Sequence, residues 1–171
     1  MCATHQSLER CRLSVIAQNW ADVHYSFQLP GGAFVPPPEV DVGVVRLVPL
    51  RKPYIDLPYE LVDRVVHALF VGGKNRFIRT SLRSLFTPLS LNERKDLVDE
   101  LLKISDLNPE HSAPKLSMEE IKSLCFAWKH MSDNHPKLKR MVEESEFCTD
   151  EASYVNVDDL DSDTSEFVVK F

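Results

Sequence analysis

Glycine, cysteine and long apolar runs are all scarce in this chain of 171 residues. Its five glycines stand at 31, 32, 43, 72 and 73, so neither a Gly-x-Gly-x-x-Gly fingerprint nor a Walker-type phosphate loop is present. The Gly-x-Ser-x-Gly elbow of serine hydrolases is also missing. No stretch of about eighteen apolar residues occurs, so the sequence predicts no membrane-spanning helix.

Metal-binding patterns are missing as well. The four cysteines form no Cys-x-x-Cys pair and no zinc-like spacing with histidine, which indicates reduced thiols in an intracellular protein. His130 and His135 are five residues apart across an expected helix end, and this spacing favours surface histidines over metal ligands. We therefore expect no metal.

Acidic residues outnumber basic ones, 26 to 20, but they are unevenly distributed. From Glu143 to the end there are 10 acids and one base, whereas residues 1–142 hold 16 acids and 19 bases. A net acidic chain argues against nucleic-acid binding, but the part before the tail is mildly basic. Residues 143–171 are predicted to form an acidic, disordered tail.

The first third of the chain predicts a helix and two strands. Residues 11–19 favour a short helix, and apolar side chains alternate along a strand over 22–29. A Pro-Gly-Gly turn follows, and then a second strand over 40–47 with a bulge near Val44–Val45. Two strands alone are only marginally stable in water, so they require either further strands or a cover of helices.

Four helices are expected in the middle of the chain, as a helical domain over 51–142. The first begins at Leu57 and ends at a Gly-Gly pair, and the second covers 74–86. The last two open at Ser90 and Ser117, each with a glutamate three residues later in a capping box. A His-Pro pair then ends or interrupts the last helix.

Phe34 is the first candidate for a binding role. It stands in Ala-Phe-Val-Pro-Pro-Pro, where three prolines hold the backbone extended. An aromatic side chain on such a rigid loop offers a stacking surface for a base that has turned out of its helix. The alternative is a core phenylalanine packed beneath a strand, and spacing alone favours that alternative.

A stripe of basic residues is the second candidate. No acidic residue occurs between Arg64 and Glu93, and the helix expected over 74–86 carries its bases apart from its apolar side chains. Such a stripe suits phosphate groups, because each contact releases counterions. A solubilising helix face is an equally open alternative. The residues of the stripe are Lys74, Arg76, Arg79 and Arg83.

Two motifs resemble the rRNA adenine N6,N6-dimethyltransferase family. Residues 12–18, RLSVIAQ, are similar to the "RLSV-x-AQ" helix of that family. Residues 33–47, AFVPPPEVDVGVVRL, are similar to its "AF-x-P-x-P-x-VD-x-x-VV" loop and strand. The resemblance covers about residues 8–141. It is greatest for the mitochondrial members, which are also described as mitochondrial transcription factors of the B type.

The resemblance implies an α/β fold, in which a Rossmann-like methyltransferase sheet is followed by a carboxyl-terminal helical domain. It implies that S-adenosyl-L-methionine donates methyl groups to two adjacent adenines of a small-subunit rRNA hairpin in the mitochondrial matrix. Small-subunit rRNA or the ribosomal subunit would then be the partner. Phe34 matches the family's aromatic residue that stacks on the target adenine, and the basic stripe matches its RNA-facing region.

The chain departs from the family pattern ahead of the first motif. The Gly-rich cofactor loop, the acidic residue for the ribose and the Asn-Leu-Pro-Tyr/Phe catalytic motif are absent, so no residue is assigned to cofactor binding. We expect a carboxyl-terminal part of such an enzyme, inactive alone, with residues 1–50 forming the last two strands of the methyltransferase sheet. No clear targeting peptide is recognisable near Met1.

Two other functions stay open at this point. The chain could be a non-catalytic module that binds RNA or the ribosome, or a mitochondrial transcription accessory factor that contacts mitochondrial DNA. Binding preference for an rRNA hairpin over duplex DNA distinguishes these two functions.

Overall fold

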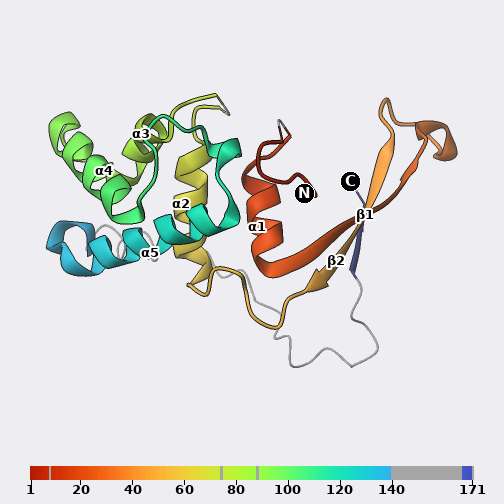
Figure 1. The fold of residues 1–171 in the computed structure, drawn as a ribbon. Helices are drawn as coiled ribbons and strands as arrows, with labels where there is room; N and C mark the ends of the chain where they lie inside the picture. Colours follow the sequence, from red (N-terminus) through yellow and green to blue (C-terminus); the bar gives the residue numbers. More distant parts are fainter. Residues whose placement is uncertain (8, 74, 88, 140–166, 171) are drawn as a thin grey trace.

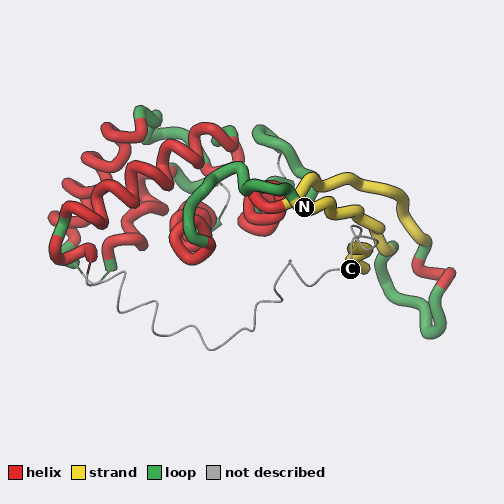
Figure 2. The backbone as a smooth tube through the Cα atoms, turned by 90° about the horizontal axis from the view of Figure 1, so that it is seen from below, coloured by secondary structure: helices red, strands yellow, loops and turns green. Residues whose placement is uncertain are grey.

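A β-hairpin projects from a cluster of helices in this protein (Figure 1). The computed structural model describes residues 1–7, 9–73, 75–87, 89–139 and 167–170. The helices gather at one end of the molecule, and the hairpin extends away from them in both views (Figures 1 and 2). The predicted α/β class with a helical part is confirmed.

The hairpin consists of β1 (Ala21–Leu29) and β2 (Val42–Pro49), which pair antiparallel. The register shifts between Tyr25 and Phe27, opposite Val44–Val45, so the extra residue of the bulge is on β1. The bulge therefore lies at the predicted position along the hairpin, but on β1 instead of β2. Both valines are buried, which explains why the apolar alternation of β2 changes parity there.

A third strand, β3 (Phe167–Lys170), pairs antiparallel with β2 and gives the sheet order β1-β2-β3. The hairpin thus has the further strand that a two-stranded ribbon requires for stability. This strand lies within residues 143–171, which the sequence predicts to be a disordered tail. Residues 143–166 and 171 lie outside the described residues.

Helices α1 (Arg12–Trp20) and α2 (Tyr59–Phe70) form where the sequence predicts them. Helix α2 ends just before Gly72 and Gly73, whose φ angles of 84° and 103° lie in the left-handed region that favours glycine. A side chain other than glycine would be strained at both positions, so the Gly-Gly pair stops the helix.

The hydrophobic core is centred on α2. Val62, Val65 and Leu69 are fully buried there, and each such side chain contributes roughly 1.5–3 kcal/mol relative to an exposed one. Val15 of α1 belongs to the same core, so α1 packs with the helices rather than with the hairpin alone.

The second predicted helix is shorter than expected. Helix α3 covers only Ile78–Ser81 and continues as the 3-10 turn η2 (Leu82–Phe86), instead of one continuous helix over 74–86. The residue before α3 is drawn into an isolated β-bridge, Phe77 with Ser112. This contact with a distant loop competes with helical hydrogen bonding and replaces the first predicted turns.

The two predicted capping boxes are confirmed. Helix α4 (Leu91–Ser105) begins after Ser90, whose backbone N–H donates to the Glu93 carboxylate at 3.1 Å. Helix α5 (Met118–Asn134) begins after Ser117, which makes the same reciprocal contacts with the glutamate three residues later. Both helix starts therefore agree with the local sequence pattern.

The His-Pro pair interrupts the last helix. His135 still donates its N–H to the Met131 carbonyl at 3.0 Å, and the chain is helical again over 136–139. A further 3-10 turn, η3 (Ala113–Lys115), precedes α5. Across the described ranges, no helix is both long and apolar enough to cross a membrane.

Candidate nucleic-acid interface

Phe34 lies in the loop at the free end of the hairpin, on the side away from the helices (Figure 2). The loop begins with a 3-10 turn, η1 (Gly31–Ala33), and the Phe34 N–H donates to the Gly31 carbonyl at 3.2 Å. The Val35–Pro36 peptide bond that follows is cis. The loop is therefore a defined turn at an outward-facing end of the molecule.

The Phe34 side chain is half-buried and does not belong to the hydrophobic core. Its neighbour Val35 is 99% exposed, and Val40 on the returning limb of the loop is 70% exposed. The Phe34 side chain is thus partly accessible, on a loop whose neighbouring side chains face solvent. Such an arrangement suits a stacking surface.

A single carboxylate closes the base of this loop. Asp41 stands just before β2, and its Oδ1 accepts a hydrogen bond from the Gly31 N–H at 3.0 Å. Its Oδ2 accepts from Nε2 of Gln28 on β1 at 2.9 Å. Charge-assisted hydrogen bonds of this kind are about twice as strong as neutral ones. We call these three residues the loop clasp.

The predicted basic stripe is divided among three elements. Arg76 lies in the turn before α3, with its guanidinium folded over Gly72, and is exposed. Arg79 on α3 is also exposed, and Arg83 on η2 is half-buried. The Nε of Arg83 is buried and has no hydrogen-bond partner among the described residues. Lys74 lies outside the described residues.

The two groups of predicted site residues are far apart. Helix α3 lies within the helical cluster, and the loop between β1 and β2 lies at the opposite end of the molecule, with α1 between them (Figure 1). Seen from below, the helices and the loop of the hairpin likewise lie at opposite ends (Figure 2). The basic residues and Phe34 therefore cannot contact the same nucleotide.

An ion pair between α1 and α2 was not anticipated from the sequence. Arg12 donates from Nε and Nη2 to the two carboxylate oxygens of Asp63 at 2.9 and 2.6 Å, and its Nη1 lies 3.2 Å from Nδ1 of His67. Arg12 also lines two cavities, of about 290 and 390 Å³. Arg12 belongs to the RLSV motif, but no sequence signal names its partners on α2.

Tyr54 fastens the connection between the sheet and the helices to α5. Its hydroxyl donates to the Glu119 carboxylate, and Nζ of Lys122 lies 5.3 Å from the centre of its ring. The hydrogen bond to Glu119 raises the pKa of Tyr54, and partial burial and the charge of Glu119 act in the same direction. These contacts hold the linker against α5.

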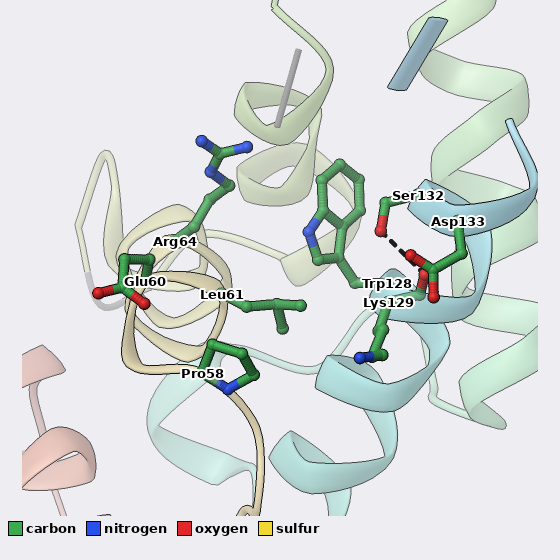
Figure 3. A pocket seen from close by; sticks show the side chains of 8 residues that line it. All are labelled: Pro58, Glu60, Leu61, Arg64, Trp128, Lys129, Ser132 and Asp133. Atoms are coloured by element: carbon green, nitrogen blue, oxygen red, sulfur yellow. Dashed lines mark hydrogen bonds between the residues drawn. The ribbon is translucent and has the colours of Figure 1, made fainter. Parts of the chain in front are cut away.

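A cavity of about 170 Å³ lies between α2 and α5 (Figure 3). Its rim carries charges of both signs, Glu60 and Arg64 on α2 and Lys129 and Asp133 on α5, beside the ring of Trp128 (Figure 3). Mixed charges give no preference for a polyanion. We therefore do not include this cavity in the nucleic-acid interface.

The described residues do not fit S-adenosylmethionine. A dinucleotide- or nucleoside-type site needs a glycine turn that leads into a helix and an acidic residue for the ribose. Gly72 and Gly73 instead follow the end of α2, and Asp63, beside the cavities at α1, is held by Arg12. No three His, Cys, Asp or Glu side chains of the described part are grouped so that they could hold a metal ion.

Comparison with known proteins identifies the same relationship as the motifs. The profile of the family described as ribosomal RNA adenine dimethylase matches residues 1–121. The mitochondrial dimethyladenosine transferase 1 of Homo sapiens is 39% identical over 138 residues, which cover 81% of this chain and 39% of the relative. The protein of the same name from Xenopus tropicalis is 36% identical over 138 residues, with the same coverage. The chain thus spans 39% of the length of these curated relatives.

A solved structure supports the fold. The crystal structure of a dimethyladenosine transferase from Plasmodium falciparum superposes with a TM-score of 0.55 at 17% sequence identity. The superposition covers 70% of this chain and 49% of that chain. At this identity, the likeness concerns the arrangement of helices and strands alone.

Proposed function

The chain belongs to the ribosomal RNA adenine dimethylase family, and on that premise we propose that it provides the RNA-binding side of adenine dimethylation. The substrate that we assign is a small-subunit rRNA hairpin with two adjacent adenines, in the mitochondrial matrix. The mitochondrial names of the relatives support this location.

The position of Phe34 carries this proposal. Phe34 is half-buried, lies outside the hydrophobic core and stands on a clasped loop at the free end of the hairpin. A base that leaves its helix must be received by a flat apolar surface, because unstacking costs a few kcal/mol that a new stacking contact offsets. In this proposal, Phe34 stacks on one of the two adenines.

The basic residues have a different role in the proposal. Arg79 and Arg76 are exposed on the helical cluster, so they would contact RNA phosphates at a distance from the target adenine. Lys74 and Arg83 complete the predicted set. Because α3 and the loop that carries Phe34 lie at opposite ends of the molecule, the RNA would reach both ends when it makes both sets of contacts.

S-adenosylmethionine is the methyl donor of the family, but the described residues do not fit it. We therefore assign this chain no step that involves the cofactor, and the residues that we assign bind and orient the adenine only. This mismatch also supports a second candidate, a non-catalytic module that binds RNA or the ribosome. If the chain instead bound duplex DNA in preference to hairpin RNA, that result would support a transcription accessory role on mitochondrial DNA.

Binding of a synthetic small-subunit rRNA hairpin, measured at one fixed salt concentration, tests the proposal. We expect Phe34→Ala to weaken binding roughly tenfold, since stacking of one base contributes about 1–3 kcal/mol, and Phe34→Trp to retain it. Duplex DNA of equal length serves as competitor. Equal affinities of the wild-type chain and Phe34→Ala would show that Phe34 does not receive a base.

The salt dependence of the same binding tests the phosphate contacts. Replacing Arg79 and Arg83 by alanine should flatten the slope of log affinity against log salt by about 1 for each phosphate that is no longer neutralised. Lys95→Ala on α4 is a control for Arg79→Ala, because Lys95 is exposed like Arg79 but lies outside the basic stripe. An unchanged slope in the double variant would assign these arginines to a solvated face.

A further inference from the structure

Asp41 connects the two limbs of the Phe34 loop. One carboxylate oxygen accepts from the Gly31 N–H on the outgoing limb, and the other accepts from the Gln28 side chain at the end of β1. Asp41 itself stands on the returning limb, at the start of β2. Among the described residues, the other hydrogen bonds that join the two limbs belong to the β1–β2 ladder below the loop.

Gly31 is also packed closely against the carbonyl groups of the returning limb. A Cβ atom at this position would lie 2.8 Å from the Pro38 carbonyl oxygen and 3.3 Å from that of Val40. The returning limb therefore lies against the Gly31 backbone, and the hydrogen bond that the Gly31 N–H donates to Asp41 keeps it there. Gly31 is positioned from both sides.

Gly31 in turn positions Phe34. The Gly31 carbonyl accepts the Phe34 N–H, and the Pro30 carbonyl accepts the Ala33 N–H at 2.9 Å, which closes the turn η1. Only two hydrogen bonds, Asp41 to Gly31 and Gly31 to Phe34, separate the carboxylate from the backbone of the aromatic residue. We infer that Asp41 is a positioning residue, which holds the loop in the conformation that presents Phe34 to the target adenine.

This inference rests on the proposed function. Because Asp41 is negatively charged, the direction in which its removal changes the RNA affinity tests the inference. A carboxylate near an RNA backbone is repelled by phosphates, so its removal should strengthen binding if Asp41 has no structural part. A positioning role predicts the opposite, weaker binding. Glu39 is a matched control, since it is an exposed acid on the same limb with no hydrogen bond or ion pair among the described residues.

The experiment measures hairpin RNA affinity for Asp41→Ala, Asp41→Asn and Glu39→Ala, with circular dichroism to confirm an unchanged melting temperature. We expect Asp41→Ala to weaken binding roughly fivefold, since loss of an ordered loop forfeits most of the stacking energy of one base. Asp41→Asn should stay near wild type, because its amide oxygen still accepts from Gly31 and Gln28 can turn its amide to match. Glu39→Ala should bind as wild type or tighter.

A double-mutant cycle separates positioning from a general loss of stability. In the Phe34→Ala background, Asp41→Ala should weaken binding no further, because Asp41 acts through Phe34. Wild-type or tighter binding by Asp41→Ala, or equal weakening in both backgrounds, would overturn the inference. If Asp41→Ala lowers the melting temperature, Gln28→Ala replaces it in the cycle. Gln28→Ala removes only one hydrogen bond of the clasp, and its RNA affinity in the wild-type and Phe34→Ala backgrounds is judged in the same way.

The outcomes for the two proposals are distinguishable. If Phe34→Ala has no effect, the proposed stacking fails, whatever the clasp does. If Phe34→Ala weakens binding but neither Asp41→Ala nor Gln28→Ala does, the stacking stands and the positioning role fails.

Discussion

Gly31 and Gly32 are neighbours in the sequence but have different surroundings at the hairpin tip. The space where Gly31 would carry a Cβ is occupied by the Pro38 carbonyl oxygen at 2.8 Å, whereas nothing lies within 4 Å of the same position at Gly32. Neither residue has a positive φ, so any penalty for alanine comes from contact and not from backbone strain. Alanine substitutions at these two positions can therefore be compared to test whether close packing at Gly31 keeps the Phe34 loop ordered.

Gly31→Ala should loosen the turn that carries Phe34, and Gly32→Ala should not. An overpacked contact with backbone costs typically 1–3 kcal/mol, so we expect roughly tenfold faster hydrogen exchange at the Ala33 and Phe34 amides in Gly31→Ala. Exchange measured by NMR checks this. Equal exchange rates in the two alanine variants would mean that the limbs are not in close contact at Gly31.

At the level of single residues, the sequence indicated Phe34 because prolines and an aromatic residue are adjacent in it. It did not indicate the clasp. Asp41 accepts from residues 10 and 13 positions earlier in the chain, and that meeting depends on the hairpin register. The pairing of Arg12 with Asp63 spans 51 positions and depends on helix packing in the same way.

Among the elements, α2 shows how much of the fold follows from local pattern. Its apolar residues recur at helical spacing, and the structure buries most of that face, with Val62, Val65, Val66 and Leu69 at 0% exposure. The capping boxes of α4 and α5 are likewise local features, and both are present. Helix α3 is the counter-example, because the bridge between Phe77 and Ser112 shortens it.

Leu69→Ala should destabilise the protein strongly, whereas Leu91→Ala should not. Removing a buried leucine leaves a cavity and costs about 2–5 kcal/mol of unfolding free energy. Leu91, at the start of α4, is 67% exposed, so the same substitution there should change stability by less than about 0.5 kcal/mol. Urea unfolding followed by circular dichroism compares the two, and similar destabilisation by both would contradict the placement of α2 at the core.

For the whole molecule, the main result is the separation of two surfaces. The Phe34 loop and the basic residues around α3 lie at opposite ends, with α1 and its ion pair to α2 between them (Figure 1). Sequence patterns predicted both sets of residues but not their separation, because that separation is set by how the hairpin projects from the core. The division of the chain at residues 50 and 142 stays a prediction.

We expect no methyl transfer by this chain on its own. The Gly-rich loop and the Asn-Leu-Pro motif of the family are absent from its 171 residues, and the described residues do not fit the cofactor. Incubation of the purified chain with radiolabelled S-adenosylmethionine and unmethylated small ribosomal subunits tests this, with a complete family member as positive control. Clear turnover by the chain alone would contradict the expectation.

The account depends most on a direct contact between Phe34 and an adenine. NMR of the complex between the chain, labelled at phenylalanine rings, and the synthetic rRNA hairpin tests this contact, and a Phe34→Leu variant identifies the Phe34 signals. We predict cross-peaks between the Phe34 ring protons and the base protons of one of the two adjacent adenines. A complex that forms without such cross-peaks, or with contacts only around Arg79, would contradict the proposed role of the hairpin loop.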